Sequence, residues 1–339
     1  MDIKTDTNLK SHTTMKLGGP AHALVTINSK DELEEAVAEA HGKSLPILVL
    51  GEGSNIVVRD EGFKGMVIIN RIPGFKVLDD NDETTTIQVG SGEHWDDVVK
   101  KTVEMGLTGL EFLSKIPGTA GGTPVQNVGA YGVEIADVFD ELEAYDLDTS
   151  DFVTLTGADC HFSYRNSIFK AMQGRHYIIT SITLTLKKGN PKPPFYGSLQ
   201  RYLDEKNITT YTPQAIRDAV SAIREKTLPD PKHLANSGSF FKNPRILHEE
   251  FEKLLKDYPD LPSYPTKEGL VKIPAAWLID KTGLKGYEAH GFKIYEHNAL
   301  VFVNVSAKSY GDLEKFKDEI VAKVKAKFGV VLEQEPELL

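Results

Sequence analysis

Two glycine-rich segments are the parts of this sequence where the backbone alone can bind a ligand. The first is Gly51-Glu52-Gly53-Ser54-Asn55, directly after the apolar run 46–50. The second covers residues 116–132, reads IPGTAGGTPVQNVGAYG, and contains five glycines and two prolines. Since glycine has no Cβ and adopts positive φ freely, consecutive N–H groups in such turns can converge on an anion. The two segments therefore predict a phosphate cradle.

The first segment alone favours an ordinary β-turn. It lacks the third glycine of the dinucleotide fingerprint, and it lacks the Lys-Ser/Thr pair of a Walker A loop. The glycine density of 116–132 shifts the balance, because a loop with so few side chains must have something else packed against its backbone. A large planar cofactor with a pyrophosphate meets that need, and so does another strand, so both interpretations remain open.

Another pattern imitates the penicillin-recognising serine enzymes. Ser239 and Lys242 match S-x-x-K, and Lys281-Thr282-Gly283 matches K-T-G. We reject this interpretation because the nearest middle motif, Tyr164-Arg165-Asn166, precedes the serine instead of following it. The K-T-G match also ends an expected helix, whereas the motif lies on a strand in those enzymes.

Charged and metal-binding residue types give weaker signals. Lys226, Lys232, Lys242 and Arg245 form a basic stretch that is equally consistent with a diphosphate clamp and with a solvated face. The ten histidines contain no H-E-x-x-H and no i, i+4 pair, so we predict no metal site. The single Cys160 excludes a disulfide framework within the chain.

Composition limits the class of protein. The chain has 339 residues, which suits two or three domains, and a formal charge of −10 without a long basic run. Such an acidic chain lacks the electrostatic pattern of a nucleic-acid binder. The first thirty residues contain no apolar signal core and no later run approaches membrane-spanning length. We therefore expect a cytoplasmic protein without a nucleic-acid or membrane partner.

Apolar periodicity and caps predict a mixed α+β chain. Ser29 and Glu32 form a capping-box pattern before the first expected helix, and Gly329 is expected to end the last one. The run 177–186 alternates as a half-exposed strand should, and the proline-rich segment 187–196 reads as a linker. The expected helices are 31–40, 95–105, 212–226, 277–280 and 310–328, and the other expected strands are 46–50, 56–58, 66–69, 86–89, 141–147, 152–155 and 299–305.

The same residues carry a family likeness. The motifs TTMKLGGPA, LGEGSNIVV, IPGTAGGTPVQNVGAYG, SYRNSIFK and LPDPK…NSGSFFKNP together resemble the UDP-N-acetylenolpyruvoylglucosamine reductase family. They follow the family's order and spacing from about Leu9 to Glu335, and FYGSLQRYL after the linker resembles the longer of its two classes.

The resemblance implies an α+β fold in which a two-subdomain FAD-binding module of the PCMH or vanillyl-alcohol-oxidase type precedes a C-terminal α+β substrate domain. It divides the chain into an extension (1–16), an FAD-binding domain (17–188, its subdomains split near 70–75), a linker with a substrate-covering loop (189–212) and a substrate domain (213–339). The implied enzyme is a monomer with non-covalent FAD that uses NADPH to reduce UDP-N-acetyl-enolpyruvoylglucosamine to UDP-N-acetylmuramate for peptidoglycan synthesis.

The implied chemistry needs three catalytic side chains. Hydride addition to the methylene carbon leaves an enolate, which requires fixed positive charge and hydrogen-bond donors. By resemblance, Arg165 holds the substrate carboxylate and Ser239 donates the proton. Glu335 matches the family's glutamate, which orients the substrate carboxylate or water, or relays a proton. Because residues 336–339 replace the family's usual V-R-x-x-G ending, Glu333 and Glu337 remain alternatives.

The resemblance also implies binding residues, with one departure. Thr227 stands where the family commonly has Lys. The flexible side chain of Lys226 is expected to bring its ammonium group to the position of that family lysine. The expected substrate contacts are Tyr131, Tyr164, Arg165, Tyr196, Lys226, Asn243 and Asn298, and the expected FAD contacts are Leu50, Gly51, Glu52, Gly53, Ser54, Asn55, Ile56, Ile116, Pro117, Gly118, Gly121, Gly122, Gln126, Asn127, Gly129, Ala130 and Tyr131.

Two rival functions remain at this point. One is another FAD oxidoreductase of the same superfamily with a different substrate, which a substrate screen distinguishes. The other is a non-catalytic UDP-sugar binding protein, which a flavin-free absorbance spectrum would favour.

Overall fold

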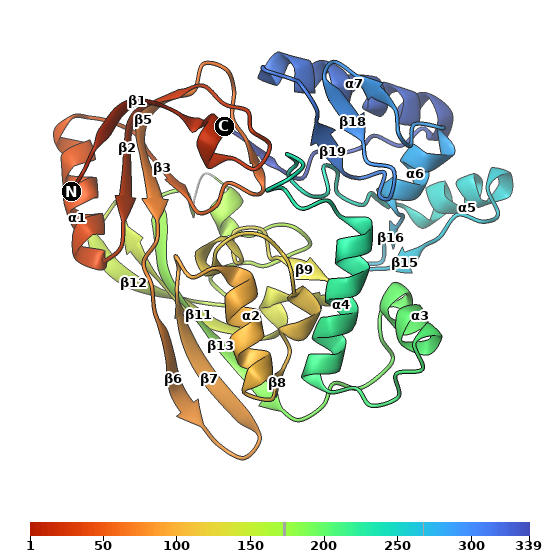
Figure 1. The fold of residues 1–339 in the computed structure, drawn as a ribbon, viewed down its shortest axis with the longest axis horizontal. Coiled ribbons are helices and arrows are strands. Elements are labelled where there is room, and N and C mark those ends of the chain that lie inside the picture. Colours follow the sequence, from red (N-terminus) through yellow and green to blue (C-terminus); the bar gives the residue numbers. More distant parts are fainter. Residues whose placement is uncertain (172–173, 267) are drawn as a thin grey trace. The chain divides into compact units, whose positions relative to one another are not determined.

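The computed structural model describes residues 1–171, 174–266 and 268–339 (Figure 1). It divides into two compact units, each built from several stretches of the chain. The first contains Met1–Thr7, Ala21–Glu52 and Phe63–Glu225, and the second contains Asn8–Pro20, Gly53–Gly62 and Lys226–Leu339. The segment expected as a linker and the helix after it fall inside the first unit, while the domain boundaries expected from the sequence stay a prediction.

A mostly parallel sheet forms one part of the first unit. Its strand order is β1 (Lys4–Asn8), β2 (Pro20–Ile27), β5 (Phe63–Asn70) and β3 (Ile47–Leu50), with β5 parallel to both β2 and β3. The helix α1 (Lys30–Gly42) buries Leu33, Ala36, Val37 and Ala40 in the same core. Ser29 begins α1 by accepting a hydrogen bond from the Glu32 N–H, as the sequence predicts.

An antiparallel sheet forms the other part of this unit. Its order is β12 (Asp151–Thr156), β11 (Phe139–Asp146), β13 (Tyr177–Lys188), β7 (Thr84–Gly90) and β6 (Phe75–Asp80), and β8 (Leu107–Thr108) also pairs with β13. The helix α2 (Trp95–Glu104) shares its core.

The expectation that strand 177–186 is half exposed is wrong. This strand, β13, lies between β11 and β7 and contributes residues to two hydrophobic cores. Ile178 belongs to the core of the parallel sheet, and Ile182 belongs to the core under α2. Thr180 and Thr183 in this strand are buried as well.

Two helices complete the first unit. The helix α3 (Gly197–Glu205) follows the proline-rich segment, and α4 (Pro213–Thr227) begins where the Thr212 hydroxyl accepts a hydrogen bond from the Ala215 N–H. Leu199, Leu203, Ile216 and Val220 pack together with Phe112.

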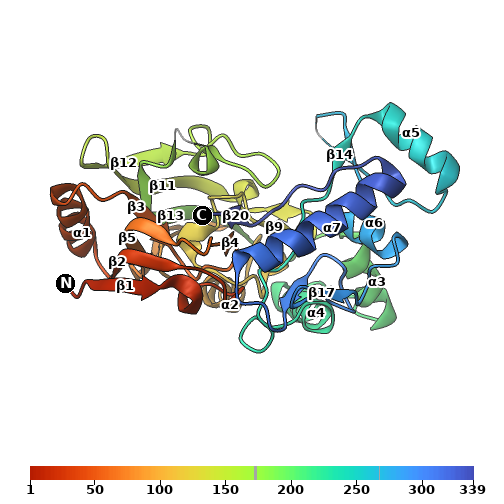
Figure 2. The same cartoon turned by 90° about the horizontal axis from the view of Figure 1, so that it is seen from above.

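The second unit contains small sheets and the helices α5, α6 and α7 (Figure 2). One sheet has the order β14 (Arg245–Ile246), β16 (Val271–Lys272) and β15 (Tyr264–Pro265), and another has the order β17 (Glu288–Ala289), β18 (Phe292–Ile294) and β19 (Phe302–Asn304). The strand β20 (Glu337–Leu338) pairs with β4 (Ile56–Val57). The helices are α5 (His248–Asp257), α6 (Ala275–Lys281) and α7 (Tyr310–Phe328).

The long helix α7 has the predicted bounds. It is capped by Ser309 and ends at Gly329, whose φ of 71° is the left-handed conformation that glycine adopts without steric cost. Phe316 on its apolar face packs against the ring of Phe302, and the rings of Phe240 and Phe241 also contact Phe302 in the same core. None of the helices in the described parts of the chain has both the length and the apolar character that crossing a bilayer requires.

Candidate active site

Gly51 and Glu52, at the start of the first glycine-rich segment, meet the second segment within the first unit. The Gly118 N–H donates to the Glu52 carboxylate at 3.0 Å, and a Cβ added to Gly51 would lie 2.6 Å from the Thr119 hydroxyl. Arg71 donates to the Gly51 carbonyl at 3.1 Å, which fixes the end of β3. Two stretches that are more than sixty residues apart in the sequence therefore form one structural element.

The second segment is a tightly packed loop with open room on one side. A Cβ added to Gly121 would lie 2.6 Å from the Ser91 Cβ and 3.1 Å from the Ser91 backbone, so only glycine fits there. At Gly122 the nearest atom to an added Cβ is 3.9 Å away, and at Gly132 nothing lies within 4 Å. Protein therefore covers the loop at Gly121 and leaves it open at Gly122.

A side-chain amide orders the end of this loop. Asn127 is buried, and its Nδ2 donates to the Glu134 carboxylate at 2.8 Å and to the Ser163 carbonyl at 3.2 Å. The strand pair β9 (Gly129–Ala130) and β10 (Val133–Glu134) follows directly. The resemblance predicts Asn127 as a cofactor contact, and its hydrogen bonds give it a role in shaping the loop.

Arg165 contacts the same end of the loop from a separate turn. Ser163 and Asn166 exchange two backbone hydrogen bonds of 3.0 Å, so Tyr164 and Arg165 form the tip of a tight turn. Arg165 has φ of 55°, a conformation that costs a non-glycine residue about 1–3 kcal/mol and is typical of functional positions. Its Nη2 donates to the Gly129 carbonyl at 2.6 Å, and its guanidinium lies 5.1 Å from the centre of the Tyr164 ring.

Tyr131 and Tyr196 are also brought together in this unit. Their ring centres are 6.1 Å apart at 89°, an edge-to-face contact between the loop and the residue that precedes α3. Burial raises the pKa of the Tyr131 hydroxyl above its ordinary value, while the nearby Arg224 opposes that shift. Tyr131 is therefore a neutral side chain at working pH.

The second unit brings Ser239 and Glu335 to neighbouring positions on paired backbone. Ser239 forms an antiparallel bridge with Val301, and the Phe240 N–H donates to the Leu300 carbonyl at 2.8 Å. The Glu335 N–H donates to the Phe240 carbonyl at 2.9 Å, so Glu335 pairs with the residue directly after Ser239. Both side chains are half-buried.

The alternative glutamates have other surroundings. Glu333 is exposed and forms an ion pair with Lys242. Glu337 lies in β20, where its N–H donates to the Asn55 carbonyl at 2.9 Å. The position of Glu335 beside Ser239 favours it as the acid side chain of the site.

The remaining predicted residues lie as follows. Asn298 accepts from the Leu300 N–H at 3.1 Å, next to the Ser239 strand, whereas Asn243 accepts from the Ala275 N–H at 3.0 Å at the start of α6. Lys226 is exposed at the end of α4. Leu50 ends β3. The loop 116–132 holds four predicted contacts that are half-buried: Ile116, Pro117, Gln126 and Ala130. The second unit contains the others, which are Gly53, Ser54, Asn55 and Ile56.

The basic stretch is partly accounted for by ion pairs. Besides Lys242, Arg245 pairs with Glu268 at 3.2 Å. Lys281, from the penicillin-like K-T-G match, ends α6 and pairs with Asp260 at 2.7 Å, which agrees with its expected position at a helix end.

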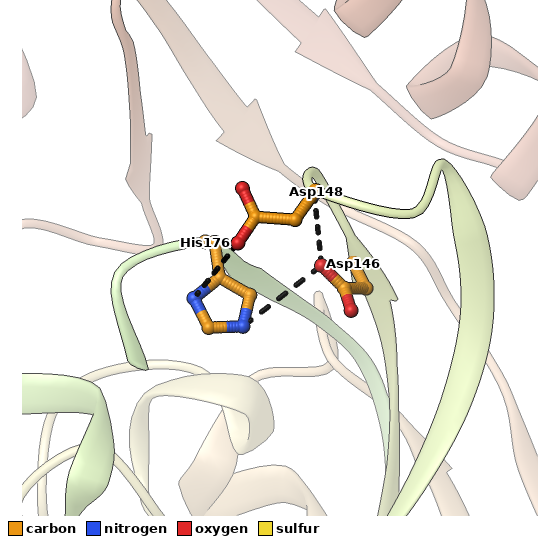
Figure 3. A group of neighbouring side chains, drawn as sticks. All are labelled: Asp146, Asp148 and His176. Carbon is orange, nitrogen blue, oxygen red and sulfur yellow. Dashed lines mark hydrogen bonds and ion pairs between the residues drawn. The ribbon is translucent and has the colours of Figure 1, made fainter. Parts of the chain in front are cut away.

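Asp146, Asp148 and His176 form a cluster of metal-binding residue types (Figure 3). The two ring nitrogens of His176 lie 3.9 Å from Asp146 Oδ1 and from Asp148 Oδ2. Asp146 Oδ1 also accepts from the Asp148 N–H at 2.9 Å, and the His176 ring packs on Tyr177. Ion pairing and ring packing account for this arrangement.

Sequence reasoning missed the charged groups on α4. Arg217 and Arg224 are spaced seven residues apart, which places them on one helix face, but charges on a helix usually indicate a solvated surface. Arg217 binds both carboxylate oxygens of Asp96, at 2.7 and 3.0 Å. The Nε atom of Arg224 is buried and has no hydrogen-bond partner among the described residues.

These features fit a bound flavin nucleotide. The loop backbone is free at Gly122 and Gly132, one buried guanidinium nitrogen lacks a partner, and Arg165 lies where the loop ends. Within the first unit, the residues that would hold the cofactor are Gly51, Glu52 and those of the segment 116–132, with positive φ at Gly118, Asn127, Tyr131 and Gly132.

Comparisons with known proteins agree with this reading. Residues 21–156 match the family model of an FAD binding domain, and residues 230–339 match that of the UDP-N-acetylenolpyruvoylglucosamine reductase C-terminal domain. The expected α+β order of an FAD-binding module followed by a C-terminal domain is confirmed.

Similar whole proteins extend the match over nearly the full chain. The UDP-N-acetylenolpyruvoylglucosamine reductase of Neisseria gonorrhoeae is 41% identical over 338 residues, which is 99% of this chain and 97% of that protein. The reductase of the same name from Ralstonia nicotianae is 40% identical and covers 97% of this chain and 96% of its own. The crystal structure of the reductase (MurB) from Thermus caldophilus aligns with a TM-score of 0.67 and 25% identity, covering 99% of this chain and 98% of that one.

Proposed function

The chain belongs to the UDP-N-acetylenolpyruvoylglucosamine reductase family, and on that premise we propose that it reduces UDP-N-acetyl-enolpyruvoylglucosamine to UDP-N-acetylmuramate with NADPH. It is an oxidoreductase with an FAD-binding domain. The observation that carries the proposal is the 41% identity over 99% of the chain, which includes both units. The product would supply peptidoglycan synthesis.

FAD supplies one kind of chemistry when it is bound, the passage of a hydride from NADPH to the methylene carbon of the enolpyruvyl group. The chain must provide the rest. The glycine-rich segments would hold the cofactor non-covalently through backbone N–H groups. Its contacts would be residues 50–56 and Ile116, Pro117, Gly118, Gly121, Gly122, Gln126, Asn127, Gly129, Ala130 and Tyr131.

Arg165 would bind the carboxylate of the enolpyruvyl group. Negative charge grows on that carboxylate during hydride addition, and a fixed guanidinium stabilises it without reorganisation. The hydrogen bond from Arg165 to the Gly129 carbonyl and its strained turn hold the side chain in one place. Tyr164 flanks the guanidinium and limits its movement.

Ser239 would then donate a proton to the carbon that bears the carboxylate. A serine hydroxyl is a weak acid, so it needs a group that replaces its proton. Glu335, whose backbone pairs with the residue after Ser239, is the acid best placed for that role in the second unit. Tyr131, Tyr196, Lys226, Asn243 and Asn298 would contact the UDP-sugar.

A steady-state assay tests the proposed function. Purified protein is mixed with FAD, NADPH and UDP-N-acetyl-enolpyruvoylglucosamine, and NADPH loss is followed together with the mass of the sugar product. We expect one NADPH consumed for each lactyl ether formed. If the protein binds FAD and leaves this substrate unchanged, the activity is that of another FAD oxidoreductase. A protein that binds the UDP-sugar but retains no flavin would be a non-catalytic binder.

A further inference from the structure

The carboxylate of Glu52 brings a negative charge into the first glycine-rich segment, and the function proposed above gives this side chain no role. One of its oxygens, Oε2, accepts a hydrogen bond from the Gly118 N–H at 3.0 Å. The other, Oε1, lies 3.4 Å from His94 Nε2, within ion-pair distance. Glu52 is half-buried, and all three residues belong to the first unit. Its carboxylate is therefore engaged by protein on both oxygens.

Gly118 is held on both sides of its backbone. Its carbonyl accepts the Trp95 N–H at 3.0 Å, at the first residue of α2. Its φ of 128° is a conformation that glycine adopts freely and that residues with a Cβ rarely adopt. Gly118 has no side chain that could fix this conformation, so neighbouring groups must do so. The Glu52 carboxylate is the group that fixes the direction of its N–H.

His94 joins this contact to the start of α2. It directly precedes that helix and lies opposite Thr119 in an antiparallel bridge, so its backbone runs beside the second glycine-rich segment. Its Nδ1 is buried 3.6 Å from Asp97 Oδ2 and has no hydrogen-bond partner among the described residues. The ring thus lies between two carboxylates, with Nε2 toward Glu52. This places the imidazole where it supports one oxygen of Glu52 while the other binds the loop.

Direct contact between this carboxylate and the phosphates of FAD would be unfavourable. Like charges repel each other, and they do so more strongly where protein excludes water. An acidic side chain beside an anionic cofactor therefore weakens binding unless it stabilises the site in another way. The contacts of Glu52 with Gly118 and His94 supply such a way.

We propose that the Glu52 carboxylate is a positioning group for FAD. Supported by His94, it fixes the Gly118 N–H and holds the end of β3 against the loop 116–132 in the arrangement that binds the cofactor. Its side chain then acts through the loop and does not contact FAD itself. The proposal rests on FAD binding by the first unit and is independent of which sugar is reduced.

Substitutions at Glu52 separate the position of the acceptor oxygen from its charge. Glu52→Gln keeps an acceptor of the same reach, so FAD affinity should stay within about fivefold of the unmodified chain. Glu52→Ala removes the acceptor, and the loss of a hydrogen bond to a charged group should weaken FAD binding at least about tenfold. Glu52→Asp keeps the charge but is one methylene shorter, so it should bind FAD more weakly than Glu52→Gln.

The test uses the full chain. FAD affinity is measured by titration of the flavin-stripped protein, so neither NADPH nor the sugar is needed. Glu32→Ala is the matched control, because Glu32 is also half-buried and its carboxylate accepts a backbone N–H, from Asn28 at 2.6 Å, at the start of α1. This control loses a similar contact outside the glycine-rich segments and should leave FAD affinity unchanged.

A double-mutant cycle tests the part of His94. His94→Ala should weaken FAD binding about twofold to fivefold in the unmodified chain. It should have no further effect in Glu52→Ala, because His94 acts through Glu52. Equal effects of His94→Ala in both chains would refute its supporting role.

Two results overturn the role of Glu52. The first is a folded Glu52→Ala protein that binds FAD within threefold of the unmodified chain, or more tightly, as removal of a repelling charge would produce. If Glu52→Ala does not fold, the second decides: Glu52→Asp that binds FAD as tightly as Glu52→Gln. An unmodified chain that binds FAD but does not oxidise NADPH refutes the proposed function and leaves this assay valid.

Discussion

The first unit arranges its predicted cofactor loops through glycine and through side chains that bind backbone, whereas the second unit arranges Ser239 and Glu335 through paired backbone. In the first, the Gly118 N–H meets the Glu52 carboxylate and Arg165 meets the Gly129 carbonyl. In the second, the Phe240 carbonyl accepts from the Glu335 N–H. The first unit should therefore be sensitive to an added methyl group or a lost charge, and the second to loss of a single hydroxyl at its reactive position.

The two units also differ in their packing. The Ser239 strand is anchored by Phe240 and Phe241, whose rings pack on Phe302 in a core that is fully buried. The loop 116–132 has backbone that protein leaves open at Gly122. The backbone around Ser239 is thus rigidly supported, whereas the loop backbone at Gly122 is open to a ligand.

The largest expected effect is that of Ser239→Ala. Removing the proton donor should lower turnover about a hundredfold to ten-thousandfold. The flavin should still be reduced by NADPH, because Ser239 has no part in that step. Stopped-flow absorbance of each half-reaction checks this, and turnover equal to that of the unmodified protein would refute the assignment.

Asp96→Asn should be the most destabilising change in the first unit. It leaves the buried Arg217 guanidinium without its carboxylate, which costs about 3 kcal/mol in the free energy of unfolding. Denaturant unfolding measures the loss. Asp97→Asn, an exposed neighbour on α2, is the control and should stay close to the unmodified protein. Equal stabilities for both variants would contradict a structural role for this pair.

The same pair predicts how stability depends on pH. Burial alone would raise the pKa of Asp96, but hydrogen bonds from Arg217 and from the Lys115 N–H lower it below the ordinary value. A depressed carboxyl pKa contributes stability that is present above the unfolded value of about 3.9 and is lost as the pH falls through the folded value. Unfolding followed from pH 7 downward should show this loss, and Asp96→Asn should show less of it.

Substitutions at two neighbouring glycines are expected to have different effects, one on stability and the other on FAD binding. Gly121→Ala places a methyl group against the Ser91 backbone and should cost about 1–3 kcal/mol of stability. Gly122→Ala has room for its methyl group and should unfold normally, yet bind FAD more weakly because the methyl enters the space proposed for the cofactor. Thermal melts and FAD titrations check both. Normal FAD affinity in Gly122→Ala would exclude that backbone from the cofactor contact.

The smallest expected effect belongs to the second unit. Ser309 caps α7 through the Asp312 N–H, so Ser309→Ala should cost about 1 kcal/mol. Thermal unfolding measures this cost. FAD affinity should not change, and a loss of affinity would show that the two units are coupled more strongly than their separate architectures indicate.

The sequence predicted the features that depend on residues close together in the chain, such as helix ends. Ser29 and Gly329 mark helix ends because a hydroxyl cap and a left-handed glycine act within a few residues. The family motifs supplied Arg165 and Ser239, whose types alone would indicate a surface ion pair and a turn. The roles of these residues stay proposals.

The features that the sequence did not predict depend on contacts between residues far apart in the chain. The strand β13 has the alternation of a half-exposed strand but lies inside two cores, and nothing in its own residues indicates those neighbours. The approach of Gly118 to Glu52 likewise depends on where the strands lead the chain. Arg217 and Arg224 look like surface charges until the positions of Asp96 and Lys115 are known.

The central claim is that a flavin held by the first unit passes electrons from NADPH to an enolpyruvyl UDP-sugar. An anaerobic series of two additions tests it most directly. The account predicts that NADPH bleaches the flavin absorbance of the purified protein and that UDP-N-acetyl-enolpyruvoylglucosamine then restores it with formation of UDP-N-acetylmuramate. Flavin that stays oxidised with NADPH, or that stays bleached after the sugar is added, would contradict the account.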